Sequence, residues 1–479
     1  GGTYYGTGSY WEYNRASFFG RINYNFNDRY LFQFTFREDG SSKFGADSRW
    51  GFFPSVAVGW RISEEPFFPK NSVISNLKFR ASWGQLGNEN ALGKYDFLAR
   101  ISSYNDMYMG YVQGAGSNPW TGSIARALEN RSLKWETTDT KNIGFDFGLF
   151  GNHLNGNVNY YINETRDLLI TRRIAPSAGL DNPTLNVGKM RNQGFELELN
   201  WNDKINDFEY NVGFNISTIA NKVVALANED QTIYGVGLKY GTEHFPTQTK
   251  VGKPIGAFYL YQADGIFQSL EEVQAHKNSK GELLQPNAQP GDVRFKDMNG
   301  DGVIDEDDKT YSGTGIAKVE ANLNLGASYK GFDFSAVIGS AFGNKLYNGI
   351  RYYYEGMNSG SNFLKTTLNA WTPTNTKTDI PRAVFGDPNQ NTRESTRFLE
   401  NGDFVRLRQV QLGYTLPKAL SKHIYCESIR FYVSAENVFT ITGYSGANPE
   451  FSQGVLNSGI DRFTYPFSRS YTVGAQVSF

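Results

Sequence analysis

The last ten residues of the chain, SYTVGAQVSF, constrain its fold more than any other stretch. Every second residue from Tyr471 to Phe479 is apolar, and the residues between them are serine, threonine, glycine and glutamine. A strict period of two is typical of a β-strand with one apolar and one polar face. About ten residues is also the length with which a tilted β-strand crosses a lipid bilayer.

The same alternation recurs along the whole chain, and we expect about 15 such strands, with boundaries uncertain by a few residues. The predicted strands are Phe18–Phe26, Arg29–Arg37, Phe52–Ile62, Leu77–Leu86, Trp135–Phe150, Leu154–Leu168, Asn186–Trp201, Phe208–Ile219, a weaker pair at Glu243–Val251 and Ile255–Phe267, then Lys318–Tyr329, Phe332–Phe342, Phe398–Tyr414, Ile429–Ile441 and Arg469–Phe479.

The connections between these strands alternate between short and long. Gly151–Asn152 and Lys330–Gly331 are short, whereas Gly87–Lys134 and Gln268–Ala317 are long. Short turns at one end and long loops at the other are typical of outer-membrane barrels. We therefore predict an all-β fold, a transmembrane antiparallel β-barrel with long extracellular loops. A soluble β-sandwich or propeller also has alternating strands, but the loop asymmetry and the aromatic strand faces disfavour it.

Composition agrees with a barrel. No apolar run reaches the roughly 18 residues of a membrane helix, and a mean hydropathy of −0.49 suits strands of which half faces water. No linker or low-complexity tract divides residues 1–479, so we expect one architecture. The chain opens in a loop-like stretch without a signal peptide. We therefore expect it to be the C-terminal part of a longer precursor.

Several function classes find no support. The net charge is −1 and the basic residues are interleaved with acids, unlike a nucleic-acid binder. Cys426 is the one cysteine and the four histidines are far apart, which disfavours a disulfide or a cysteine or histidine metal site. No nucleophile and base pair or phosphate-binding loop is present, so we do not expect an enzyme.

Charged and aromatic side chains remain as candidates for contact with a solute. The charged residues on polar strand faces would point into the barrel lumen, where simple hydration is the alternative role; they are Lys78, Arg80, Asp146, Glu196, Glu198 and Glu436. Aromatic clusters in loops, such as Tyr352–Tyr354, could stack on sugar rings or pack against a protein. Packing within the loops or at the membrane interface is the alternative for them.

The sharpest local pattern is GDVRFKDMNGDGVIDEDD, residues 291–308. Oxygen donors stand at positions 1, 3, 5, 7, 9 and 12 of an EF-hand type of loop, with Gly302 at the sharp turn; they are Asp297, Asn299, Asp301, the carbonyl of Val303, Asp305 and Asp308. We predict a structural Ca²⁺ site in an extracellular loop. Position 12 is Asp308, where an EF-hand loop usually has Glu. The alternative to a Ca²⁺ site is a solvated Asp/Asn/Gly turn.

Several stretches together resemble one family, the SusC/RagA-type TonB-dependent outer-membrane transporters. They are FFGRINYNFNDRYLFQFTFREDGSSKFG, RWGFFPSVAVGWRISEE, PGDVRFKDMNGDGVIDEDD, RFLENGDFVRLRQVQLGYTLP and IRFYVSAENVFTITGYSGANPE, followed by the C-terminal Phe479. The resemblance covers essentially the whole chain in the right order. It implies a barrel of 22 strands in the full protein, of which about the last 15 are here, filled by an N-terminal plug that this sequence lacks.

The resemblance also implies a location, an activity and partners. The location is the outer membrane, and the activity is import powered by TonB acting on the plug. A SusD-like surface lipoprotein would cap the barrel, and oligosaccharides would be the substrate. The alternatives are a RagA-like importer of peptides, a passive pore and a surface-binding barrel. The residues that contact the substrate cannot be identified from the sequence.

Overall fold

The computed structural model describes residues 10–69, 73–103, 123–127, 129–172, 174–227, 231–240, 242–358, 362–423, 425–451 and 453–479. The chain forms two compact units. The first comprises Gly1–Gly148, Val158–Gln193 and Val223–Gln231. The second comprises Leu149–Asn157, Gly194–Lys222 and Thr232–Phe479.

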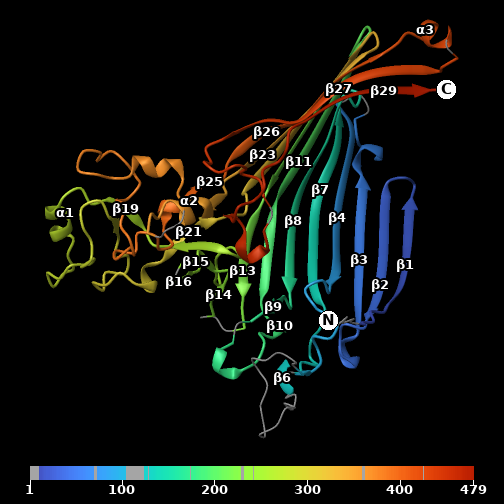
Figure 1. Cartoon of the computed structure of the whole chain (residues 1–479). Coiled ribbons are helices and arrows are strands. Elements are labelled where there is room, and N and C mark those ends of the chain that lie inside the picture. The colour runs from blue at the N-terminus through green and yellow to red at the C-terminus, as the bar shows by residue number, and fades with distance from the viewer. Residues whose placement is uncertain are drawn as a thin grey trace, which may run out of the picture. The chain divides into compact units, whose positions relative to one another are not determined.

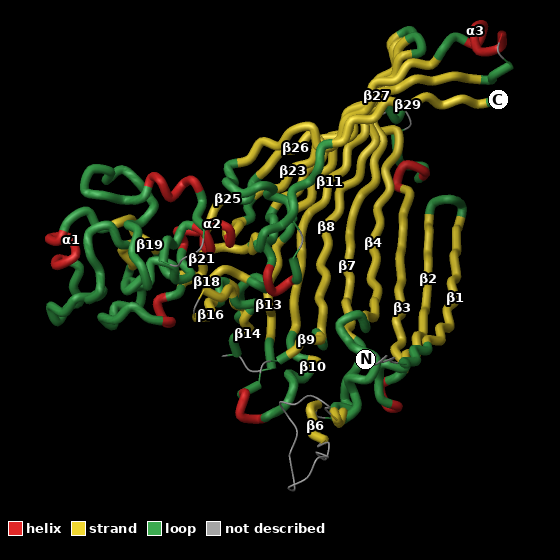
Figure 2. The backbone as a smooth tube through the Cα atoms, in the orientation of Figure 1, coloured by secondary structure: helices red, strands yellow, loops and turns green. Residues whose placement is uncertain are grey.

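Antiparallel strands dominate the structure (Figures 1 and 2). The largest sheet has 14 strands in the order β1-β2-β3-β4-β7-β8-β11-β12-β22-β23-β26-β27-β29, with β13 beside β11. These strands are β1 Arg15–Phe26, β2 Tyr30–Ser41, β3 Trp50–Arg61, β4 Ile74–Asn88, β7 Glu136–Leu149, β8 Leu154–Arg166, β11 Lys189–Ile205, β12 Phe208–Thr218, β13 Ala220–Ala225, β22 Val319–Tyr329, β23 Phe332–Phe342, β26 Phe404–Thr415, β27 Ser428–Thr442 and β29 Ser470–Ser478.

The other elements are short. Three α-helices are described, α1 Leu270–Ala275, α2 Gly349–Tyr354 and α3 Lys418–His423. None of the described helices is long and apolar enough to cross a membrane. The short strands are β5 Arg100–Ser103, β6 Ser123–Ala127, β9 Leu169–Thr171, β10 Thr184–Asn186, β14 Ile233–Tyr234, β15 Leu238–Tyr240, β16 Thr242–His244, β17 Thr247–Thr249, β18 Ala257–Leu260, β19 Ala263–Ile266, β20 Val293–Phe295, β21 Thr310–Thr314, β24 Lys345–Asn348, β25 Leu399–Asn401 and β28 Ile460–Asp461.

Thirteen of the predicted strands coincide with strands of the large sheet. The weaker pair, Glu243–Val251 and Ile255–Phe267, contains only short strands outside that sheet, so its prediction as two barrel strands is wrong. β12 pairs directly with β22, from Phe208 opposite Tyr329 to Thr218 opposite Val319. The chain between them is therefore one long insertion. Its β17 and β18 belong to a separate sheet of order β14-β17-β18-β21. All residues of β17 and β18 are buried, unlike a strand with one face in water.

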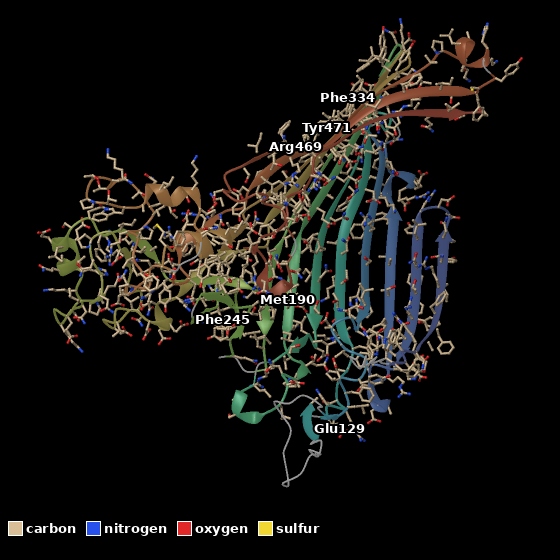
Figure 3. All side chains as sticks on the ribbon, in the orientation of Figure 1. Glu129, Met190, Phe245, Phe334, Arg469 and Tyr471 are labelled. Atoms are coloured by element: carbon tan, nitrogen blue, oxygen red, sulfur yellow. The ribbon has the colours of Figure 1, made fainter. Side chains whose placement is uncertain are left out.

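The strand register keeps the two faces of the sheet distinct. Directly opposed residues of an antiparallel pair lie on the same face. Val433 of β27 stands opposite Val473 of β29, and the neighbouring rung joins Ser434 to Thr472. Val433 and Val473 are 50% and 85% exposed. Tyr471 and Phe334, labelled in Figure 3, belong to the same apolar face. Exposed apolar side chains on this scale suit contact with lipid rather than water.

The short turns have the backbone that tight hairpins require. Asn27 and Asp28 have φ of 51° and 53°, and Lys330 and Gly331 have φ of 45° and 90°. Positive φ at both central residues is the type I′ turn, whose twist matches that of the strands. Aromatic side chains gather beside these turns, as Phe26 with Tyr30 and Phe332 with Tyr414.

The loops of the second unit have their own hydrophobic core, which we call the loop core. Its fully buried side chains are Leu238, Phe258, Leu260, Tyr347, Tyr352, Phe398 and Ile460. Tyr352 therefore packs within the loops, which was the alternative to stacking on a sugar. The segments that supply these residues are far apart in sequence, so long loops hold one another in place.

The two faces predict opposite responses to the same substitution. Val433→Arg should cost about 2–4 kcal/mol of stability in a bilayer, because Val433 lies mid-strand on the apolar face. Ser434→Arg is the matched control and should cost much less, since its side chain stands on the polar face. Equilibrium unfolding in lipid vesicles measures both. An equal cost for the two variants would contradict the assignment of the faces.

Candidate functional site

The predicted calcium-binding residues lie in one loop of the second unit, between β20 and β21. Gly300 and Gly302 have φ of 77° and 92°, a region that residues with a Cβ rarely adopt. The two oxygens of Asp297 accept hydrogen bonds from the backbone N–H groups of Gly300 and Gly302, at 2.7 and 2.9 Å. Asp301 accepts from the N–H of Val303 at 2.9 Å. The acidic side chains thus shape the loop by turning back onto its backbone.

Asp308 closes the same loop from its far end. Its side chain is fully buried. One oxygen accepts from the N–H of Met298 at 2.6 Å and the other from the N–H of Asp305 at 2.8 Å. Asn299 accepts from the N–H of Asp301 at 2.9 Å. These bonds fit a self-contained turn, and they also leave lone pairs on the carboxylates for a cation.

Across the described part of the chain, no group of three or more His, Cys, Asp or Glu side chains is arranged to hold a metal ion. The loop also offers oxygen donors of other kinds, the amide of Asn299 and the carbonyl of Val303. The Ca²⁺ site stays a prediction.

A buried ion cluster, which sequence patterns did not indicate, holds the loops of the second unit together. The side chains of Glu394 and Lys309 are each 2% exposed, and the Lys309 ammonium donates to a Glu394 oxygen. The other Glu394 oxygen faces Nδ1 of His244. Lys309 also donates to Glu306 at 2.7 Å. Three distant loop segments therefore meet at one carboxylate.

The charge state of Glu394 follows from its neighbours. Burial alone would raise its pKa, but the His244 imidazole and the Lys309 ammonium outweigh burial and lower the pKa from 4.5 to about 2. A lowered carboxylate pKa stabilises the fold above the ordinary value and loses that effect as the pH falls toward about 2. The Glu394 carboxylate is thus ionised at neutral pH, and its contribution to stability is fully present there.

A second ion network surrounds α2. Arg351 donates to Glu355 at 3.0 Å and to Glu400 at 3.2 Å, and Arg397 donates to Glu355 at 3.0 Å. Burial lowers the pKa of Arg397 to about 10, against the opposing effect of Glu355. Beside the network lies a cavity of about 770 Å³ whose lining includes Arg351, Glu400 and Asp379. Its size and its many carboxylate and amide groups suit a polar ligand.

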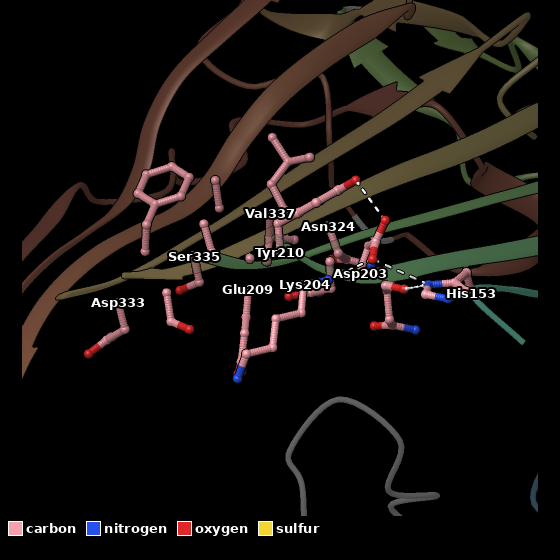
Figure 4. A pocket seen from close by; sticks show the side chains of 17 residues that line it. His153, Asp203, Lys204, Glu209, Tyr210, Asn324, Asp333, Ser335 and Val337 are labelled. Carbon is pink, nitrogen blue, oxygen red and sulfur yellow. Dashed lines mark hydrogen bonds and ion pairs between the residues drawn. The ribbon is translucent and has the colours of Figure 1, made fainter. Parts of the chain in front are cut away.

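A larger hollow of about 830 Å³ in the second unit is lined by residues of both strand faces (Figure 4). Lys204 forms an ion pair with Glu209, and Nδ1 of His153 lies 3.4 Å from Asp203. Asp333 and Asn324 also line the hollow. It lies where β11, β12, β22 and β23 approach their short turns. Its lining combines charged and amide side chains with apolar ones such as Leu325 and Phe334.

The charged residues predicted on polar strand faces are mostly paired with neighbours. Lys78 and Arg80 both contact Asp146, at 3.2 and 2.7 Å. Glu198 accepts from Asn157 at 3.0 Å. Glu196 stands opposite Ser217, and Glu436 stands opposite Gln409 and Ser470. Their place on the polar face is confirmed by the register, and their contact with a solute stays a prediction.

The buried cluster yields a local stability test. Glu394→Gln should destabilise the loop core by about 3 kcal/mol, because it removes one member of a buried ion pair and leaves Lys309 undercompensated. Hydrogen exchange of residues 244–261 and 392–398 measures the effect. Glu306→Gln is the matched control on the same lysine; Glu306 is 69% exposed, so at most about 1 kcal/mol is expected. Equal effects would refute the central role of Glu394.

Known proteins resemble this chain over nearly its whole length. The family model described as TonB dependent receptor-like, beta-barrel, matches residues 1–438. The TonB-dependent receptor P3 of Formosa agariphila is 31% identical over 98% of this chain and 46% of its own length. The TonB-dependent receptor SusC of Bacteroides thetaiotaomicron is 31% identical over 97% of this chain and 44% of its own length.

Among solved structures, that of the RagAB peptide transporter matches with a TM-score of 0.79 and 26% identity, over 98% of this chain and 48% of the solved chain. The chain thus spans about half the length of the relatives it matches. These relatives are receptors and transporters of the outer membrane rather than members of an enzyme family. With its alternating strands and two-faced sheet, the chain belongs to the TonB-dependent receptor-like β-barrel family of the outer membrane.

Proposed function

We propose that this chain is part of the barrel of an importer that takes up oligosaccharides across the outer membrane. The observation that carries the proposal is the 31% identity to SusC over 97% of this chain. The sheet's apolar outer face and hydrated polar face provide what a transport barrel needs. TonB powers the import through a plug outside this sequence, and a SusD-like surface lipoprotein caps the loops.

Peptides are the second candidate substrate. The similarity to the solved RagAB peptide transporter, with a TM-score of 0.79, favours them. The lining of the cavity beside α2 includes Arg351, Glu355, Asp379 and Glu400, and none of its described residues is aromatic. Charged and amide groups can bind either peptide groups or sugar hydroxyls, so the cavity supports import of a polar oligomer of either class.

Uptake by cells with and without TonB tests the proposal. The full-length protein should carry labelled oligosaccharides into the periplasm only when TonB is present, and a surface lipoprotein should copurify with it in mild detergent. Uptake of peptides but not sugars would instead assign the second candidate. TonB-independent uptake together with large open-channel conductance would make the barrel a passive pore.

We also propose that the loop from Asp297 to Asp308 binds Ca²⁺ and makes the surrounding insertion rigid. The proposal is supported by the alternating oxygen donors and by the turn at Gly302. Because Asp308 already accepts three backbone N–H groups, the ion would rely mainly on Asp297, Asn299, Asp301 and Asp305.

Removing the ion provides the test. In the parent protein a chelator should speed proteolysis within residues 268–317 by about tenfold or more, because bound ligand stabilises the state that binds it. The double variant D297N/D301N should be cleaved rapidly with or without Ca²⁺. Asp307→Asn is the matched control, since Asp307 lies in the same loop but is not a predicted ligand. Cleavage of the parent at one rate in Ca²⁺ and in chelator would reject the site.

A further inference from the structure

The polar face of β1–β4 carries a row of basic side chains, all in the first unit. Register places them on one face: Arg21 stands opposite Thr35, Thr35 opposite Ser55, and Arg61 opposite Lys78. Residues two apart along each strand share that face. We call this row the basic track; it consists of Arg15, Arg37, Arg21, Arg80, Lys78 and Arg61.

The basic track runs along the strands rather than gathering at one point. Measured along β2, Arg15 lies at the level of Ser41 and Arg21 at the level of Thr35. Arg80 stands opposite Gly59, which stands opposite Leu31, and Lys78 and Arg61 form the next rung. Successive levels are two or four residues apart, about 7 or 13 Å, and the whole track spans about 40 Å. A track of this length reaches across a bilayer.

The carboxylates that contact the basic track do not neutralise it. Asp39 forms ion pairs with both Arg15 and Arg37, with nitrogen–oxygen distances of 3.3 and 2.6 Å. Asp146 of β7 likewise forms ion pairs with both Lys78 and Arg80. Each carboxylate is therefore shared by two cations.

The other two cations of the basic track have no acid beside them among the described residues. Within the described chain, Arg21 contacts the hydroxyl of Thr35 at 3.3 Å, and no carboxylate lies within ion-pair distance of Arg21 or Arg61. Even with Glu136 of β7 included, six cations face three carboxylates, which leaves a net charge of about +3 on this face.

A hydrated polar strand face does not by itself require positive charge. The polar face of β11, β12, β22 and β23 in the second unit has the opposite sign. It carries one cation, Lys204, and five carboxylates, which are Glu196, Glu198, Glu209, Glu320 and Asp333. The sign on β1–β4 is therefore a property of that wall and not of barrel interiors in general.

We propose that the basic track selects anionic oligosaccharides, chains whose sugar rings carry carboxylate or sulfate groups, and guides them along this wall. The proposal rests on the proposed function of oligosaccharide import and names its substrate class. Guanidinium groups bind such oxyanions through paired hydrogen bonds. A hollow of about 670 Å³ has a lining that includes Arg15, Arg37, their shared partner Asp39, Gln33 and Thr35, which leaves room for a ligand beside the cations.

Neighbouring levels of the track are close enough to act in sequence. Charges about 7–13 Å apart lie near the screening length at physiological salt, so an anionic chain can contact the next cation before leaving the last. A wall with a net positive charge also raises the local concentration of anions. A neutral chain of equal length gains neither effect.

The test uses full-length protein in cells with its partner lipoprotein and two matched probes: a hexamer of galacturonate, and the neutral hexamer made by reducing its carboxyl groups. The variant R21Q/R61Q removes the two cations that have no acid partner in the described part of the chain, so it leaves no described carboxylate unpaired. Its uptake of the anionic hexamer should fall about tenfold, with less than a twofold change for the neutral hexamer. Arg131→Gln is the control, because Arg131 is 74% exposed and lies outside the strand face.

The outcomes separate the two proposals. If the parent imports neither hexamer but imports peptides, oligosaccharide import itself fails. If the parent imports the neutral hexamer as well as the anionic one, the basic track is not selective and the inference is overturned. An equal loss of both probes in R21Q/R61Q also overturns it, since the wall would then pack against another part of the protein. Should R21Q/R61Q fail to assemble, Arg21→Gln alone carries the same comparison.

Discussion

The antiparallel hydrogen-bond ladder is the constraint on which the rest of the structure depends. In lipid, every backbone N–H and C=O must find a partner within the protein, and strands can supply partners only by pairing edge to edge. Once paired, successive side chains must point to opposite faces. A membrane-spanning strand therefore commits every second residue to lipid. Val212 stands opposite Leu325, and Leu325 stands opposite Ala336. Apolar residues of three neighbouring strands therefore share one face.

The same constraint explains why the strands could be predicted from sequence. A slip of one residue would move every apolar side chain of a strand to the polar face. The alternation in Lys318–Tyr329 therefore determines both the existence of β22 and its register with β12 and β23. Tight turns such as Lys330–Gly331 add an independent signal, because few residues adopt positive φ without strain. Local pattern and global fold agree in these segments, so thirteen strands of the large sheet could be identified.

The loops follow no such rule, so their short strands and their buried ion cluster could not be predicted from the sequence. Thr247–Thr249 and Ala257–Leu260 lie in short strands that are buried on every side, so neither a period of two nor a membrane length marks their place. Glu394 is central to the loop core, yet its partners Lys309 and His244 lie 85 and 150 residues away. A single charged residue in a polar loop carries no sign of such a partner. The acidic loop at Asp297–Asp308 could be recognised because its oxygen-bearing residues lie close together in sequence. The same spacing, however, fits a turn as well as a cation site.

The two faces of the sheet differ in how freely they can vary. The apolar face is fixed by lipid, where a charge costs several kcal/mol at mid-membrane. The polar face must only be hydrated, so the ladder leaves the sign of its charges open. Within the residues that the structure describes, neither Arg21 nor Arg61 balances a buried carboxylate or belongs to a buried core, so the fold does not depend on them. Glu394, by contrast, cannot change without disturbing three loops. If the proposed import takes a substrate past this wall, residues that the fold does not require are the positions at which selectivity can change at the least cost to stability.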